Sequence, residues 1–507
     1  MQYLCNRLYF KQSILFKSSI MRTLNRFRFY PIGFFFILLI AFSSCKSQLK
    51  SEPKGLSNPE TDVWQQADDI IAKIGKPQFP DVDFNIMDYG AVADGKTLNS
   101  DAFASAIEAC NAAGGGRVVV PAGSYLTGPI HLKSNVNLYL AQDSEILFTT
   151  DKSAYLPAVH TSYEGMEIMN YSPLIYAKGQ KNIAVTGSGV LNGQADNNNW
   201  WPWSGAERYG HKEGDPQQKD EHNLPSLFKM IETDMAVEDR KFGEGHQLRP
   251  LFFETLECEN VLLQGVTFTN APFWVIHPLK SKYITVDGVT VNSHGPNNDG
   301  CDPEYSKYVH ITNCKFNTGD DCIAIKSGRN GDGRRVNIPS ENIVVENCDM
   351  KDGHGGVVMG SEISAGVRNV FVRNCTMNSP NLDRAIRIKT NTLRGGFVEN
   401  VYVKDIEIGQ VKEAVLRINL YYGIYGVQEG EFIPTIKNIN LENVNVENGG
   451  EYGILINGRP EKPVTGITFK NVTIKGAETP TSIENCEPIT YINTTINGTQ
   501  MGETQKD

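Results

Sequence analysis

The chain has 507 residues, of which 40% are hydrophobic and 21% are charged, and its formal net charge is −10. A chain of this length can bury a large core, either in several domains or in one repeat fold. The acidic balance argues against a nucleic-acid-binding protein, which usually needs a basic face. An acidic protein can bind an anionic substrate only through a local basic patch, so any such patch is informative.

The first 45 residues are typical of a bacterial export signal. An arginine-rich stretch, which begins at Met21, precedes an apolar run that ends in small residues and Cys45. This ending resembles a lipobox, in which the cysteine is lipidated and becomes the mature N-terminus, and Met21 is a second candidate for the start of translation. A span across the bilayer is disfavoured because the run is short. We expect an exported lipoprotein that is periplasmic or held at the outer membrane by its lipid.

Residues 46–80 are rich in Ser, Lys, Pro and Gln, a composition that predicts a tether. A short helix is expected within it, from Val63 to Ile74. The folded domain is predicted at residues 81–480, followed by a C-terminal tail at residues 481–507.

One strand pattern recurs from Asn182 to about Ile474: apolar residues alternate with others, the phase slips at an Asn, Gly or Asp, and the alternation resumes. Alternation buries one face of a strand, and the slip marks a corner. Asn, Gly and Asp tolerate the left-handed backbone conformation that a corner needs. From Val261 on, the copies start roughly 23 to 38 residues apart, which is typical of a solenoid with loops of varying length. The predicted fold is all-β, a right-handed parallel β-helix, with corners at Gly187, Gly265, Gly288, Asn313, Asn347, Asn374, Asp405, Asn443 and Asn471.

Three cysteines, Cys314, Cys348 and Cys375, directly follow equivalent corners. They are expected to stack in the core as small apolar side chains beside a ladder of corner asparagines. A disulfide or a metal site is the alternative, but the chain shows no CxxC spacing here.

A helix with Asp101 near its start precedes the repeats and shows apolar residues at helical spacing. A short N-terminal helix of this kind can cap the first coil, whose core would otherwise be exposed. The glycines at 114–116 follow this helix and lack the Gly-Lys-Ser/Thr ending of a phosphate loop, so a turn is expected there.

Four short motifs contain the residues best suited to catalysis: Asn297-Asn298-Asp299-Gly300, Gly319-Asp320-Asp321-Cys322, Gly353-His354-Gly355 and Arg387-Ile388-Lys389. Each lies near an equivalent point of the repeat, so coils stacked about 4.8 Å apart bring the motifs onto one outer sheet. Hydrolysis of a glycoside needs a protonated acid for the leaving oxygen and a carboxylate base for water. Crowded carboxylates raise at least one pKa, which favours that division of roles. A calcium site or a solvated turn is the alternative.

In this order the motifs resemble the polygalacturonase family of glycoside hydrolases, glycoside hydrolase family 28, within the pectin-degrading β-helix group. The resemblance covers Phe84 to about Ile474, and the usual Asn-Thr-Asp of the family reads Asn-Asn-Asp here. It implies inverting hydrolysis, in which the acid and the base stand about 6.5 to 9.5 Å apart. We expect neither a cofactor nor a metal.

The resemblance also implies a role for each polar residue of the motifs. Asp320 would be the general acid, and Asp299 and Asp321 would hold and activate water. His354 would tune the protonation of the acid, and Asn297 would contact substrate.

The stretch Arg384 to Thr390 predicts a basic patch. Ile386 and Ile388 should face inward, so that Arg387 and Lys389 emerge together on the outer face. Two adjacent cations are costly unless they meet an anion, and the carboxylate of a galacturonate suits them, with a bidentate fork from Arg387 and a point charge from Lys389.

Two further residues are candidates for the substrate cleft. Lys326 is a weaker candidate for the same carboxylate, provided that Ile323 and Ile325 point inward. Tyr421 aligns with a tyrosine that lines the cleft in the family, although Tyr422 stands beside it. Trp200, Trp201 and Trp203 either stack on sugar rings or pack within a loop.

The stretch from Trp203 to Pro250 is charged, lacks periodicity and is long for a loop between coils. Insertions of this length are usually functional lids or disordered segments. Its basic residues are expected to close one end of the groove and to hold the terminal sugar, so that the enzyme trims chain ends; they are Arg208, His211, Lys212, Lys219 and Arg240.

The sequence therefore predicts a monomeric enzyme that hydrolyses α-1,4-galacturonosidic bonds in pectic polysaccharide, with inversion and from a chain end. A hydrolase of rhamnogalacturonan or of substituted galacturonan is the nearest alternative. A polysaccharide lyase on the same fold is a second alternative, and a non-catalytic glycan-binding β-helix is a third.

Overall fold

The computed structural model describes residues 60–423, 425 and 429–502. The predicted export signal, Cys45 and the first part of the tether lie outside the described residues. No helix in the described part of the chain is both long and apolar enough to cross a membrane.

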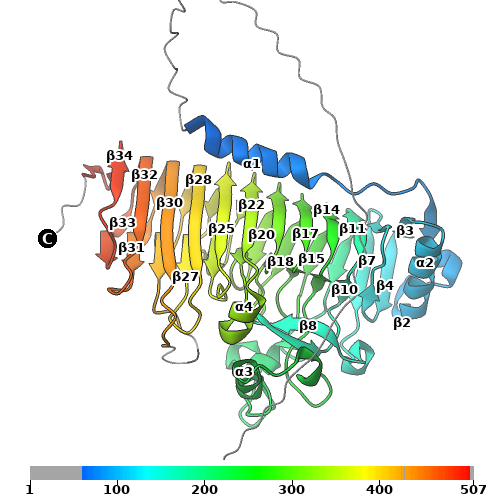
Figure 1. Ribbon diagram of the computed structural model, residues 1–507. Coiled ribbons are helices and arrows are strands. Elements are labelled where there is room, and N and C mark those ends of the chain that lie inside the picture. The colour runs from blue at the N-terminus through cyan, green and yellow to red at the C-terminus, as the bar shows by residue number, and fades with distance from the viewer. Residues whose placement is uncertain (1–59, 424, 426–428, 503–507) are drawn as a thin grey trace, which may run out of the picture. The chain divides into compact units, whose positions relative to one another are not determined.

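The chain winds into a parallel β-helix, in which successive coils contribute strands to three rows (Figure 1). Register pairs follow the predicted repeat, as in Val261 with Ile284 and Ile284 with Val309. The predicted β-helix is therefore confirmed. The first row contains β1 (Asp83–Asn85), β3 (Gly116–Val120), β6 (Val136–Leu140), β11 (Lys181–Gly187), β14 (Glu259–Gln264), β17 (Lys282–Asp287), β19 (Lys307–Thr312), β22 (Ser340–Glu346), β25 (Val367–Arg373), β28 (Phe397–Gln410), β30 (Thr435–Asn448), β32 (Thr465–Ile474) and β34 (Thr490–Ile492).

The second row follows the corner, and in β28, β30 and β32 one long strand continues through the corner into it. Its separate strands are β2 (Asp94–Leu98), β4 (Gly123–Thr127), β7 (Ser144–Phe148), β12 (Val190–Asn192), β15 (Thr267–Thr269), β18 (Thr290–Ser293), β20 (Lys315–Thr318), β23 (Asp349–Met350), β26 (Thr376–Asn378), β35 (Thr495–Ile496) and the antiparallel β36 (Thr499–Gln500).

The third row positions the candidate site. It contains β5 (Ile130–His131), β10 (Ile175–Lys178), β13 (Phe253–Leu256), β16 (Ile276–Leu279), β21 (Ile323–Ile325), β24 (Val357–Gly360), β27 (Arg384–Lys389), β29 (Ala414–Asn419), β31 (Gly450–Asn457) and β33 (Ala477–Glu484). Isolated bridges at Cys301 and Glu304 connect β16 to β21, so this face continues across the coils.

All nine predicted corner residues have left-handed backbone conformations, with φ between 52° and 115°. Side-chain amides bridge neighbouring coils at several corners; Asn443 donates to Asp405 at 2.8 Å and Asn471 donates to Asn443 at 3.1 Å. The three corner cysteines are buried and unbridged, as predicted. The corners thus satisfy their polar groups along the outside of the solenoid while the thiols pack inside.

The helix α2 (Ser100–Ala112) covers the first coil, as predicted, and the 3₁₀ turn η1 (Ile86–Tyr89) lies against it. It buries Phe103, Ile107 and Cys110 in the main core. The glycines that follow have positive φ values and form the predicted turn.

The helix predicted from Val63 to Ile74 is confirmed as α1 (Glu60–Ile74). The tether is wrong for its second half, because α1 packs on the outside of the first row. Ala67 and Ile70 are buried against Val344 and Phe371, and the ring of Trp64 meets that of Phe371 edge to face. These strands carry apolar side chains on their outward face, and α1 removes them from water.

The predicted C-terminal tail is also wrong for most of its length. The strands β34 and β35 pair with β32, and Tyr491 stacks on Phe469. The solenoid therefore continues to Gln500, because short strands still complete the last coil.

The insertion from Trp203 to Pro250 is folded. It includes α3 (Leu224–Glu232) and the 3₁₀ turns η3 (Trp201–Ser204), η4 (Glu207–Tyr209) and η5 (Val237–Asp239). With the hairpin β8 (Val159–Tyr163) and β9 (Met166–Asn170), and with Phe273 and Trp274, it forms a second hydrophobic cluster. The helix α4 (Asn330–Val336) packs against α3, and η2 (Lys152–Tyr155) precedes the hairpin.

Candidate active site

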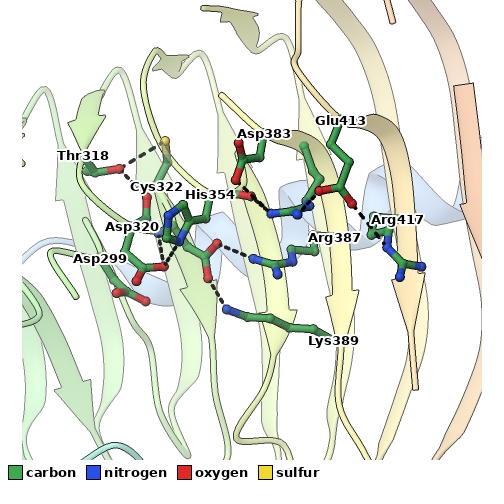
Figure 2. A network of polar contacts seen from close by, with 12 residues as sticks. Asp299, Thr318, Asp320, Cys322, His354, Asp383, Arg387, Lys389, Glu413 and Arg417 are labelled. Atoms are coloured by element: carbon green, nitrogen blue, oxygen red, sulfur yellow. Dashed lines mark hydrogen bonds and ion pairs between the residues drawn. The ribbon is translucent and has the colours of Figure 1, made fainter. Parts of the chain in front are cut away.

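Three of the four motifs lie where the chain turns from the second row into the third, and the fourth lies within the third row. Asp320 and Asp321 directly precede β21, and His354 precedes β24. Arg387 and Lys389 lie within β27, one coil further on. Register pairs link these coils, so residues distant in sequence face one another on the outside of the third row (Figure 2).

Three carboxylates form the centre of the site, and each has a cationic partner of its own. Oxygens of Asp299, Asp320 and Asp321 lie within 4.8 Å of one another. Nδ1 of His354 is 2.9 Å from Oδ1 of Asp320, and Nζ of Lys389 is 2.6 Å from Oδ2 of Asp321. The spacing would allow a metal ion, but these cations already balance the carboxylate charges, which disfavours a divalent cation.

The electrostatic environment separates the three acids. Burial raises the pKa of Asp299 to about 7, helped by the charges of Asp320 and Asp321 and opposed by Lys326. Burial would also raise the pKa of Asp320, but the charge and hydrogen bond of His354 outweigh it and lower that pKa. In turn, Asp320 raises the pKa of His354 to about 9. In the free protein, the proton between these two groups therefore resides on the imidazole.

The nearest oxygens of the three carboxylates lie within 4.8 Å of one another, which is shorter than the ~6.5 to 9.5 Å expected between the acid and the base of an inverting pair. The difference arises because three carboxylates, contributed by two neighbouring coils, surround one point. A water molecule would be held between Asp299 and Asp321 instead of in front of a single distant base.

The basic pair faces outward as predicted, but its side chains are buried. Arg387 and Lys389 both contact Asp321, at 3.3 and 2.6 Å (Figure 2). Asp321 is therefore the anion that offsets the cost of two adjacent cations before substrate arrives.

Lys326 lines the second cavity, so its predicted place in the cleft is confirmed, but it already contacts three acids. Its Nζ lies 3.3 Å from Asp299, 3.5 Å from Glu362 and 3.8 Å from Asp302, and all four side chains are buried. It also lies 4.2 Å from the centre of the Trp274 ring. Lys326 holds Asp299 in place through their ion pair. Burial, together with the charge of Asp299, raises the pKa of the neighbouring Asp302 well above its usual value.

The tyrosine of the cleft is Tyr422, so the prediction of Tyr421 is wrong. Tyr421 is 46% exposed and stacks under the guanidinium of Arg459, 3.6 Å from its ring centre. Tyr422 lines the cavity beside Asp320, and its ring centre lies 5.4 Å from Arg387 and 5.2 Å from Lys389. Both tyrosines follow the end of β29 at Asn419, so the alternation of side chains along the strand does not predict which of them faces the cleft.

Asn297 lines the site as predicted, with its side chain held by a residue that the sequence did not reveal. Arg249 is fully buried and donates to Oδ1 of Asn297 at 2.7 Å and to Oε1 of Gln218 at 3.1 Å. Gln218 belongs to the insertion, so Arg249 connects the insertion to the site. A lone arginine before a strand gave no signal of this role.

Two cavities meet at the candidate general acid. The first has a volume of about 180 Å³ and is lined by the insertion, including Arg208, Tyr209 and Lys219. The second has a volume of about 200 Å³ and is lined by Lys389 and Tyr422 among others. Both are also lined by Asn297, Asp320 and His354. The reacting bond would therefore lie at their junction.

The remaining predictions for the insertion have mixed outcomes. Arg240 does not reach the cleft, because its guanidinium is buried against Asp332. His211 and Lys212 line neither of the two cavities. Trp200 is buried and meets Trp203 edge to face, so this tryptophan packs within the loop.

Comparisons with known proteins agree with this geometry. Residues 236–496 match the model of glycosyl hydrolases family 28, and residues 84–197 match that of "Rhamnogalacturonase A/epimerase, pectate lyase-like". The solved structure of an exopolygalacturonase from Thermotoga maritima is 43% identical, covers 87% of this chain and 98% of its own, and gives a TM-score of 0.83. A probable polygalacturonase of Vitis vinifera is 28% identical over 77% of this chain and 74% of its own. An exo-poly-alpha-D-galacturonosidase of Dickeya chrysanthemi is 26% identical over 82% and 71%.

Fold and site together define a glycoside hydrolase built on a parallel β-helix. Acids cluster on one outer face, a histidine lies beside one of them, and a basic pair lies one coil beyond the histidine. With the match over residues 236–496 and the 43% identical structure, the chain belongs to the glycosyl hydrolases family 28.

Proposed function

We propose that the protein hydrolyses α-1,4-linked galacturonan from a chain end, with inversion at the anomeric carbon. The observation that carries this proposal is the meeting of two sugar-sized cavities at Asp320, one beside the basic pair and the other enclosed by the insertion. A lyase is less well supported, because the lyase-like match covers residues 84–197 and none of the four motifs.

In the proposed reaction, Asp320 donates a proton to the glycosidic oxygen as the bond to the anomeric carbon breaks. A water held between Asp299 and Asp321 attacks that carbon from the other side and gives its proton to a carboxylate. His354 returns a proton to Asp320. When a substrate carboxylate approaches Lys389, its negative charge raises the pKa of Asp320 and favours transfer of the proton from the imidazole.

Attack at a chain end is supported by a contact that closes the cleft. The ring of Tyr425, from the loop after β29, lies 5.7 Å from that of Phe228 in α3. Its hydroxyl donates to Glu164 of the hairpin at 2.7 Å. Tyr425 also lines the first cavity, so the contact obstructs a long polymer at this point.

We expect the wild-type enzyme to release mono- or digalacturonate as the α-1,4 bond is cut, while the viscosity of galacturonan falls slowly relative to new reducing ends. Opening the wall with Phe228→Ala and Tyr425→Ala should produce longer oligomers and an earlier fall in viscosity. Phe432→Ala is a matched control, since Phe432 belongs to the same loop but stacks on Arg334. A steep early fall with wild-type enzyme would contradict attack at chain ends, and proton NMR of the first product tests inversion.

We also propose that Cys45 carries a lipid that holds the exported enzyme at a membrane, on the basis of the sequence before it. We expect wild-type protein in the membrane fraction of an expressing bacterium, and Cys45→Ala protein in a soluble fraction. Cys486→Ala is the control. Equal distribution of Cys45→Ala and wild type would contradict lipidation.

A further inference from the structure

The first cavity contains cations that the proposed reaction does not use. Arg208 and Lys219 line it, beside Asn297 and Asp320. Neither has a carboxylate partner among the described residues, although the insertion carries several acids. Other cations of the insertion are paired: Lys229 contacts Glu221, and Arg240 contacts Asp332.

Both side chains are exposed, and the insertion places them along the lining of the cavity. The guanidinium of Arg208 lies 4.7 Å from the ring centre of Tyr209, which also lines the cavity. Lys219 directly follows Gln218, whose side chain accepts hydrogen bonds from Tyr163 at 2.7 Å and from Arg249 at 3.1 Å. Two cations that line one cavity and have no carboxylate partner among the described residues favour an anionic ligand.

The size of the cavity limits that ligand. Its volume is about 180 Å³. This space suits one hexuronate ring. The second cavity, of about 200 Å³, suits another ring, and the carboxylate of that ring would meet Lys389.

We propose that Arg208 and Lys219 form a second carboxylate site, which binds the uronate of the sugar on the opposite side of the reacting bond from the Arg387 and Lys389 pair. The substrate unit is then two adjacent galacturonates, both ionised, with Asp320 between them. This inference rests on the proposed function and adds a requirement to it: the sugar in the first cavity must carry a free carboxylate.

The test uses digalacturonate and its two mono-methyl esters. Each of Arg208→Gln and Lys219→Gln should lower kcat/KM for digalacturonate by about ten- to a hundredfold, since each loses one charge-assisted contact. The double variant should cleave digalacturonate and the mono-ester that lacks the carboxylate of the first cavity equally well. It should still cleave the other mono-ester, which lacks the carboxylate that meets Lys389, more slowly than digalacturonate. Lys212→Gln, an exposed cation of the same insertion outside both cavities, should behave as wild type.

Discrimination against both esters that is unchanged in the double variant would overturn the inference. Its failure can be told from that of the proposed function by calorimetric binding of digalacturonate to Asp320→Asn protein. There the double substitution should weaken binding at least tenfold, with little change for neutral digalactose. If wild type releases no reducing ends from galacturonan, the proposed function fails, and this binding result still decides whether the two cations form a carboxylate site.

Discussion

Asp320→Asn should lower kcat on galacturonan by about two to four powers of ten and leave the fold intact. The amide has nearly the same shape but cannot donate an acidic proton to the leaving oxygen, and general acid catalysis contributes about this much. Initial rates of reducing-end release from galacturonan measure the loss. Asp349→Asn is the control, since Asp349 lies on β23 and accepts a hydrogen bond from Thr376, away from the cavities. Turnover within tenfold of wild type would refute the assignment of Asp320.

A second readout separates loss of the acid from general damage to the site. The charge of Asp320 is the main reason that the pKa of His354 is raised to about 9. In Asp320→Asn protein this pKa should fall toward the ordinary value of about 6.5, because the neutral amide no longer favours the imidazolium. Titration of the imidazole by NMR follows the change. A pKa that stays near 9 would mean that other groups hold the charge of His354.

The sequence was sufficient to predict the rows of the β-helix and the gathering of the motifs. A corner residue such as Asn313 is readable because the side-chain alternation slips there and because few residue types accept its φ of 56°. Once the corners are fixed, Asp320, His354 and Arg387 must fall on neighbouring coils, whatever the lengths of the loops between them.

The helix α1 was predicted, but the signal that it packs on the sheet was not interpreted. Phe371 and Tyr402 occupy outward positions of their strands, where alternation calls for polar residues, and Val344 does so one coil earlier. Outward apolar residues on successive coils indicate that something covers the sheet. The helix α1 does so, with Ala67 and Ile70 buried.

What the sequence could not supply is the conformation of loops, which lack a repeat. The choice between Tyr421 and Tyr422 depends on a turn after β29, in which Asn419 accepts a hydrogen bond from the backbone of Tyr421. The role of Arg249 depends on Gln218, in a folded insertion with no periodicity. Tertiary contacts alone decide these positions.

The same contacts change the meaning of the basic pair. The sequence predicted that Arg387 and Lys389 would be unpaired until a substrate carboxylate binds. In the structure they already neutralise the buried Asp321, so they support the catalytic carboxylate as well as the substrate. Loss of either cation should therefore affect the stability of the protein even without ligand.

Lys389→Met should lower the free energy of unfolding by about 3 kcal/mol. Removal of one partner from a buried ion pair costs about 3 to 5 kcal/mol, and the contact between Arg387 and Asp321 keeps the effect at the lower end. Denaturant unfolding without ligand measures it. In the same variant, kcat/KM for digalacturonate should fall at least tenfold through loss of the charge-assisted contact to the substrate.

The cause of the instability can be isolated by removing the charge that Lys389 neutralises. Asp321→Asn removes the anion that contacts Lys389, so Lys389→Met in that background should cost at least ~1.5 kcal/mol less than in the wild type. Lys412→Met is the control: Lys412 is exposed, 3.8 Å from Asp383, and its loss should change stability by less than about 0.5 kcal/mol. Additive effects of the two substitutions would mean that Lys389 stabilises the protein through packing of its methylene chain. The ion pair with Asp321 would then have no part in holding the site together, and Lys389 would serve the substrate alone.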